Sequence, residues 1–176
     1  MTGPSPGARR LLYFGLGLLI VICDQITKHL VAARIPLHTN IPVIPGFFDL
    51  THVRNAGAAF GIFGGMDVPW RGVFLTLVAG GVFIGVLVYA LKTPPACTGL
   101  QIALSLILGG AVGNLIDRLR FQSVTDFLRF YIGAHEWPSF NVADSAITVG
   151  VALLAWDIWR QPGERSAEPS GRPAAA

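Results

Sequence analysis

The stretch FNVADSAITVGVALLAWDIW, residues 140–159, is apolar over most of its length. A segment of about 20 such residues forms a helix long enough to cross a hydrocarbon core of about 30 Å. Asp144 lies near its start, and an ionisable group at membrane depth is costly and usually has a function. This stretch therefore predicts both a membrane-spanning helix and a functional carboxylate.

Three more segments have the length and composition of membrane spans: residues 11–33, 70–91 and 100–118. Charged residues make up 13% of the 176-residue chain, whereas soluble domains carry about 25%. The mean hydropathy of +0.58 agrees with this. We therefore expect an all-α membrane protein with four transmembrane helices, forming a single domain over residues 1–160, followed by a disordered tail over residues 161–176.

The first apolar segment has an alternative interpretation. A basic start, an apolar core and Ala32-Ala33 also fit a cleavable signal peptide. The polar cluster between Asp24 and His29 and the three spans that follow favour a permanent helix.

The connections between spans carry signals of their own. Residues 47–53 have strand-like composition, residues 54–57 form a turn, and residues 58–63 are expected to return beside the first strand. A small sheet at the membrane surface is therefore predicted. Residues 119–139 are interpreted as a polar and aromatic connection, with Ser139 as the N-cap of the last span. In the third span, Gly109 and Gly113 predict a close approach of another helix backbone.

The distribution of basic residues bears on the class of partner but does not decide the orientation of the chain in the membrane. The net charge is +3, and the basic residues flank apolar segments, where they meet lipid headgroups. No basic stripe with interleaved aromatic residues indicates nucleic-acid binding. Four spans place both termini on one side, and lysine and arginine divide almost equally between the two faces, so charge does not decide which face is cytoplasmic.

Asp126 and Asp144 are two carboxylates 18 positions apart, in the motifs VTDF (residues 124–127) and FNVADS (residues 140–145). If the connection folds back, they meet near one membrane surface and share a proton, because neighbouring carboxylates do not both ionise easily. The ionised one would activate a water, and the neutral one would polarise a peptide carbonyl. The simpler alternative is that Asp126 is solvated and Asp144 caps a helix.

Other polar residues have both structural and functional interpretations. Asp24 and Lys28 share a helix face, so they either pair with each other or leave Lys28 to contact a substrate. Asp117 beside Arg118 is most simply an ion pair at the membrane edge. Asn141, Asp144 and Thr148 form a polar stripe that must face protein or a water-filled cavity.

Residues 54–61 leave a similar choice open. They form either an ordinary turn, in which Gly57 permits a positive φ, or a site where Asn55 binds an extended peptide.

Other hydrolytic chemistries lack their motifs. The sequence contains no HExxH, no GxSxG and no GxxxxGK[ST]. Its four histidines are scattered, and its two cysteines have no metal-binding spacing. We therefore expect neither a metal nor a cofactor.

The chain resembles bacterial lipoprotein signal peptidase (signal peptidase II), a family of integral-membrane aspartic endopeptidases. The resemblance extends from residue 11 to residue 159. It rests on five motifs in order: DQxxK (24–28), NAGAAF (55–60), GNxxDR (113–118), VTDF (124–127) and FNVAD (140–144).

The resemblance implies that Asp126 and Asp144 are the catalytic dyad. It implies a bacterial cytoplasmic (inner) membrane protein with both termini cytoplasmic, an extracytoplasmic sheet and loop cradle, and an active site near the outer face. The residues that would bind substrate or support the site are Asp24, Lys28, Asn55, Gly57, Asn114, Asp117, Arg118 and Asn141.

The resemblance also implies the partners. Substrates would be diacylglyceryl-modified prolipoproteins, cleaved immediately before the lipidated cysteine. Membrane lipids would surround the enzyme, and the cyclic peptide globomycin would inhibit it.

Two other classes of function compete with this hypothesis. A small transporter or proton-coupled channel could use Asp24, Asp126 and Asp144 as relay groups, but such proteins often have paired halves or interrupted spans, and the sequence has neither. A purely structural membrane subunit would not need so many polar groups at the ends of its spans.

Overall fold

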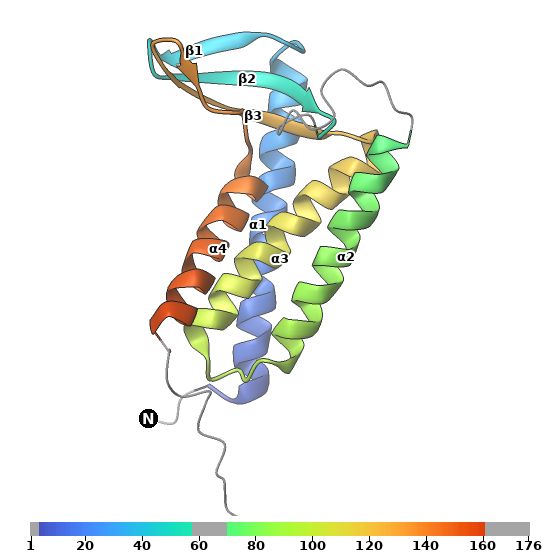
Figure 1. Cartoon of the computed structure of the whole chain (residues 1–176), viewed down its shortest axis with the longest axis vertical. Helices are drawn as coiled ribbons and strands as arrows, with labels where there is room; N and C mark the ends of the chain where they lie inside the picture. Colours follow the sequence, from blue (N-terminus) through green and yellow to red (C-terminus); the bar gives the residue numbers. More distant parts are fainter. Residues whose placement is uncertain (1–3, 58–69, 161–176) are drawn as a thin grey trace, which may run out of the picture.

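The computed structural model describes residues 4–57 and 70–160, with only the backbone of Arg71. Four helices form a bundle: α1 (Pro6–Arg34), α2 (Arg71–Lys92), α3 (Thr98–Phe121) and α4 (Val142–Arg160). A small sheet lies across one end of the bundle (Figure 1). All four helices are long and apolar enough to cross a membrane, which confirms the predicted fold class. The predicted tail, residues 161–176, lies outside the described residues.

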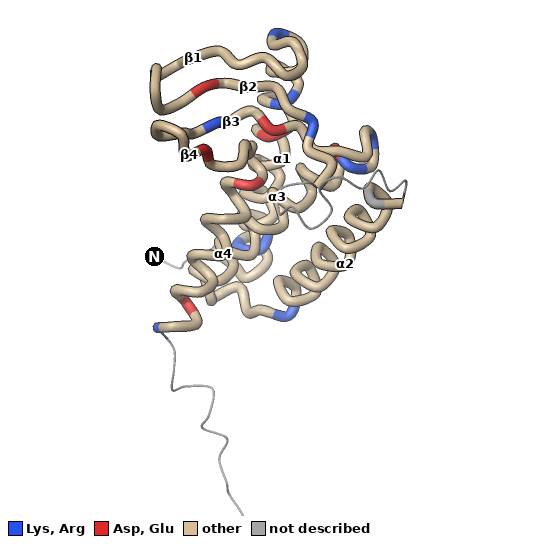
Figure 2. The backbone as a smooth tube through the Cα atoms, turned by 45° about the horizontal axis from the view of Figure 1, so that its top comes forward, with Lys and Arg blue, Asp and Glu red and all other residues tan. Residues whose placement is uncertain are grey.

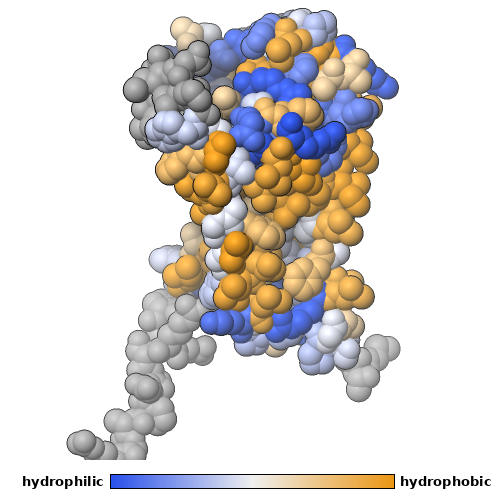
Figure 3. Space-filling view, turned by 90° about the vertical axis from the view of Figure 1, so that its right-hand side faces the viewer, coloured by the Kyte–Doolittle hydropathy of each residue, from blue (hydrophilic) through white to orange (hydrophobic). Residues whose placement is uncertain are grey.

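The surface of the bundle matches a bilayer. Many large apolar side chains point outward, including Leu11, Leu77 and Ile158 at 55–74% exposure. Figure 3 shows one face of the molecule, on which apolar side chains cover the helices between two more polar ends. Exposed apolar residues along the helices of a bundle are expected where the solvent is lipid. The chain is therefore a multi-pass membrane protein.

Helix α3 is the centre of the bundle. It packs against α1, α2 and α4, and within the described ranges α2 packs only against α3. The predicted close approach is confirmed, because a Cβ added at Gly109 would lie 2.6 Å from the carbonyl oxygen of Gly17 on α1. A Cβ added at Gly110 would clash in the same way with the carbonyl oxygen of Ala143 on α4.

The sheet is antiparallel, in the order β1 (Asn40–Ile44), β2 (Phe48–Asn55), β3 (Val124–Ile132) and β4 (His135–Glu136). Strand β2 confirms the strand predicted at residues 47–53. The interpretation of residues 119–139 as a simple connection was wrong, since β3 and β4 lie within it. The predicted return strand, residues 58–63, lies outside the described residues.

The sheet is fixed to the end of α1. Val31 of α1 and Ile35, the C-cap residue of that helix, form an apolar cluster with Phe127 of β3. His52 of β2 reaches the same helix end, with its Nδ1 2.8 Å from the carbonyl oxygen of Ile35. Because Phe127 follows Asp126 directly, this contact sets where Asp126 lies relative to the helices.

Helix α4 begins later than predicted. Its first helical residue is Val142, and the backbone N–H of Asp144 donates to Asn141 Oδ1 at 2.9 Å. That contact is an N-cap hydrogen bond, so Asn141 caps the helix and the prediction of Ser139 was wrong.

Candidate active site

Charged residues gather at the two ends of the bundle (Figure 2). At the sheet end lie the two carboxylates predicted to be catalytic, and they belong to different elements. Asp126 lies on β3 and is 2% exposed. Asp144 lies in the first turn of α4 and is partly buried.

Asp126 is held by two side-chain amides. Asn141 Nδ2 donates to its Oδ1 at 2.8 Å, and Asn55 Nδ2 donates to its Oδ2 at 3.0 Å. Burial raises the pKa of the Asp126 carboxyl to about 7, the hydrogen bond from Asn55 opposes this, and the negative charge of Asp144 raises it further. The alternative that Asp126 is merely solvated was therefore wrong.

Two asparagines connect Asp126 to Asp144. Asn114 Nδ2 donates to Asp144 Oδ1 at 2.7 Å. Asn141 Nδ2 also lies 3.2 Å from Asn114 Oδ1. A continuous chain of hydrogen bonds therefore runs from one carboxylate to the other.

Asn55 lies in the predicted turn and also contacts Asp126, while its binding of an extended peptide stays a prediction. Its Oδ1 accepts the backbone N–H of Gly57 at 2.8 Å, and its Nδ2 contacts Asp126. Gly57 has a φ of +89°, a region that glycine adopts without strain. The turn thus aims the Asn55 amide at the carboxylate.

Lys28 is the cation of the site. Its Nζ lies 2.8 Å from Asp24 Oδ2 and 3.4 Å from Asp117 Oδ2, and it donates to Asn114 Oδ1 at 3.0 Å. The side chain is 4% exposed. An ammonium has three N–H donors, so these three acceptors match its capacity, and the intrahelical pair predicted for Asp24 and Lys28 is confirmed.

Asp24 and Asp117 also fix the backbone around the dyad. Asp24 Oδ1 accepts the N–H of Ala143, in the first turn of α4, at 2.9 Å. Asp117 Oδ2 accepts the N–H of Thr125, next to Asp126, at 2.9 Å. The buried ion cluster therefore sets the positions of the two segments that carry the catalytic candidates.

One sequence prediction fails here. Asp117 forms its ion pair with Lys28 and not with Arg118, whose Nη1 lies 3.5 Å from the carbonyl oxygen of Asn114. Arg118 remains close enough for its charge to act on Asp126 and Asp144.

Thr148, the last residue of the predicted polar stripe, is exposed, and its hydroxyl donates to the Asp144 carbonyl oxygen one turn back. It therefore does not pack against protein, and the other predicted surrounding, a water-filled cavity, stays a prediction.

Gln25 is a site residue that the sequence did not single out. Its Nε2 lies 3.1 Å from Asp24 Oδ2, 3.2 Å from Asp117 Oδ1 and 3.1 Å from the carbonyl oxygen of Gly113. Its place beside Asp24 in the first motif was the available signal. Over residues 4–57 and 70–160, no group of three or more His, Cys, Asp or Glu side chains is arranged to hold a metal ion.

Comparison with known proteins decides the family. The profile of the family described as "Signal peptidase (SPase) II" matches residues 16–160. The chain belongs to the signal peptidase II family. It is therefore a peptidase.

Two relatives in the signal peptidase II family match 80–84% of this chain. The "Lipoprotein signal peptidase" of Syntrophus aciditrophicus is 45% identical over 151 residues, covering 84% of this chain and 92% of that protein. The protein of the same name from Desulforapulum autotrophicum is 48% identical over 140 residues, with 80% and 86% covered.

Two solved structures share the fold. One bacterial membrane enzyme has a TM-score of 0.76 at 30% identity, covering 92% of this chain and 94% of that one. A second has a TM-score of 0.74 at 32% identity, with 85% and 94% covered.

Proposed function

We propose that this signal peptidase II is an aspartic endopeptidase that removes the signal peptide from diacylglyceryl-modified prolipoproteins. Cleavage falls immediately before the lipidated cysteine, and Asp126 and Asp144 are the catalytic dyad. The observation that carries the proposal is the hydrogen-bonded path between these two carboxylates through Asn141 and Asn114. The relatives named lipoprotein signal peptidase support the substrate class.

The chemistry follows from one proton shared by two carboxyl groups. The ionised carboxylate takes a proton from a water, whose oxygen attacks the scissile carbonyl carbon. The neutral carboxylic acid gives its proton to the carbonyl oxygen. When the tetrahedral intermediate collapses, the C–N bond breaks and the leaving nitrogen receives the proton taken from water. One hydroxyl of the intermediate returns its proton to the carboxylate that had protonated the carbonyl oxygen, so the new carboxyl group forms and the dyad again holds one proton.

The supporting residues hold this arrangement rather than react. Asn55, Asn114 and Asn141 orient the carboxylates through the contacts described above. Lys28, Asp24 and Asp117 form the buried ion cluster behind them, and Arg118 contributes a nearby positive charge. Gly57 allows the turn that orients Asn55.

The position of the site fits the substrate. A signal peptide's apolar segment spans the bilayer, so its scissile bond lies near one membrane surface, as does a site at the sheet end of four spanning helices. We assign that end to the outer face of the bacterial inner membrane, with both termini and the tail from residue 161 in the cytoplasm. Membrane lipids surround the helices, and globomycin is expected to inhibit cleavage.

A cleavage assay tests this proposal. Purified protein in detergent micelles is incubated with a prolipoprotein in diacylglyceryl-modified and unmodified forms, and the products are identified by mass. We expect cleavage of the modified form alone, leaving the lipidated cysteine at the new N-terminus, and no cleavage by Asp144→Asn. Equal cleavage of both forms, or cleavage at another bond, would contradict the proposed substrate.

A further inference from the structure

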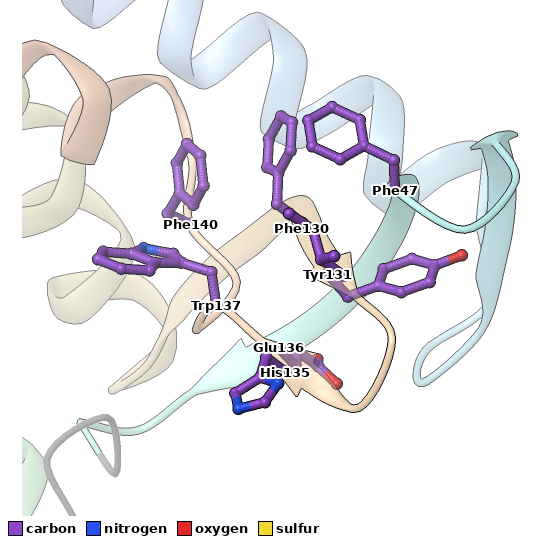
Figure 4. Close-up of a pocket in the computed structure, with 8 residues that line it drawn as sticks. Phe47, Phe130, Tyr131, His135, Glu136, Trp137 and Phe140 are labelled. Carbon is purple, nitrogen blue, oxygen red and sulfur yellow. The ribbon is translucent and has the colours of Figure 1, made fainter.

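An apolar groove of about 590 Å³ lies on the sheet, beside the start of α4. Its lining includes Phe47, Phe130, Trp137 and Phe140. Figure 4 shows the rings of Phe140, Phe130 and Phe47 in a row, with the indole of Trp137 at the Phe140 end. The Phe130 ring contacts the rings on both sides of it. Its centroid lies 5.8 Å from that of Phe140 and 5.3 Å from that of Phe47.

The groove is held open by the β3–β4 hairpin. Arg129 binds Glu136 through two hydrogen bonds of 2.7 Å, and it also donates to Asp49 on β2 at 2.9 Å. The backbone N–H of Trp137 donates to the carbonyl oxygen of Phe130 at 2.9 Å. These bonds fix the hairpin backbone at Trp137 relative to Phe130, and this backbone carries the indole at one end of the phenyl row.

The lining suits a hydrocarbon. Glu136 and Arg129 neutralise each other, and the Tyr131 hydroxyl donates to Asp49, so these polar groups are satisfied. Yet Trp137 is 69% exposed, Ile132 70% and Phe47 43%. Large apolar side chains gathered in a concave surface mark a binding site.

The groove begins where the dyad is held. Phe140 is followed directly by Asn141, which donates to Asp126. The carbonyl oxygen of Phe140 accepts the N–H groups of Phe127 and Leu128, the two residues after Asp126, at 3.0 and 2.8 Å. A ligand attached within a few bonds of the scissile peptide can therefore reach the groove.

We propose that this groove binds an acyl chain of the lipid-modified cysteine of the substrate. The inference rests on the proposed function, in which that cysteine directly follows the cleaved bond. Its acyl chains start beside the dyad, and one of them lies along the row of Phe140, Phe130 and Phe47 under the Trp137 indole. The groove thereby selects lipid-modified over unmodified precursors.

The test varies the chain length and the groove together. Substrates carrying two palmitoyl or two acetyl chains are cleaved by wild type, by Trp137→Ala and by Phe47→Ala/Trp137→Ala. Because contacts with several methylenes are lost, we expect KM for the palmitoyl substrate to rise about tenfold in the double variant, with kcat unchanged. KM for the acetyl substrate stays the same.

Trp159 provides the matched control. It is 70% exposed, like Trp137, but lies at the opposite end of α4. Trp159→Ala should leave both KM values unchanged. A photoreactive group at the end of the palmitoyl chain should crosslink to residues 130–140 in wild type.

The outcomes separate the two proposals. No cleavage of the modified substrate by wild type would overturn the proposed function and the acyl site with it. Normal cleavage with the same KM in all variants, or crosslinks spread over the lipid-facing sides of the helices, would overturn the acyl site alone. An equal rise in KM for both substrates would mean that the groove holds a bilayer lipid, which also overturns it.

Discussion

Asn141 donates a 2.8 Å hydrogen bond to Asp126 and, with the other atom of the same amide, caps helix α4 at the N–H of Asp144. One side chain thus fixes the β3 carboxylate relative to the helix turn that carries the other carboxylate. Its two functions can be separated, because a cap needs only a short side-chain oxygen, whereas the contact with Asp126 needs the amide N–H.

Replacing Asn141 tests this separation. Asn141→Ser retains a capping oxygen and Asn141→Ala does not. Both variants should lower kcat about 100-fold, because misplacing a catalytic group by about 1 Å has that effect. Only the alanine variant should also lose about 1 kcal/mol of stability. Steady-state kinetics and thermal unfolding in detergent measure the two effects, and a serine variant with wild-type kcat would refute the positioning role.

The raised pKa of Asp126 predicts an alkaline limit of activity. The dyad works with one shared proton, and the pKa of Asp126 is about 7 because the carboxyl is buried. Above that pH the dyad of the free enzyme loses its shared proton, so kcat/KM should fall as pH rises through about 7. A kcat/KM that keeps rising up to about pH 9 would contradict the shared proton.

The raised pKa of Asp126 should also make the free energy of unfolding depend on pH. The unfolded carboxyl loses its proton near pH 3.8 and the folded one near 7, so the folded state binds more protons in between. The free energy of unfolding should therefore fall as pH rises across this window, by about 4 kcal/mol in total. Asp126→Asn should lack this contribution, so its stability relative to wild type should increase with pH from about 4 to about 7. A difference that does not change with pH would exclude the raised pKa.

Lys28 should be essential for folding. Lys28→Met leaves Asp24 and Asp117 buried without their shared cation, which costs about 3–5 kcal/mol. Lys92 is exposed at the end of α2, and Lys92→Met should change stability by no more than about 0.5 kcal/mol. Unfolding temperatures in one detergent compare the two variants. Equal unfolding temperatures for the two variants would show that the ion cluster does not stabilise the fold.

Gly113 and Gly80 form a second matched pair. A Cβ added at Gly113 would lie 2.6 Å from Asp24 Oδ2, whereas nothing lies within 4 Å of one added at Gly80. Gly113→Ala should therefore destabilise the fold by about 1–3 kcal/mol and reduce activity. Gly80→Ala should be neutral or stabilise by up to about 1 kcal/mol. The idea of a close approach at Gly113 fails if both variants match wild type in unfolding temperature and cleavage rate.

The spans and the pair of Asp24 and Lys28 could be predicted from sequence because they depend on local properties. Segment length and hydropathy define a membrane helix, and residues four apart share a helix face. The close approach of another helix to α3 followed in the same way from Gly109 and Gly113, although the sequence did not identify that helix as α1.

The sheet and the site network depend on contacts between distant residues. Strand β3 contains Asp126 and Arg129, whose charges obscure a strand pattern, and it forms because β2 offers it a partner some 70 residues earlier in the chain. Gln25 and Thr125 have ordinary residue types, and their contacts with Asp117 appear only in the folded structure. The capping of α4 by Asn141 was missed because Ser139 is an equally good cap by type.

The most direct test of the account is the single-turnover rate constant for cleavage of a diacylglyceryl-modified prolipoprotein by Asp126→Asn, Asp144→Asn and the double variant. Because the two carboxyl groups act as one unit, each single variant should lose as much as the double one, about 1,000-fold or more. All three variants should keep the wild-type helix content in detergent. A single variant that retains most of the wild-type rate would show that the dyad is not the catalyst.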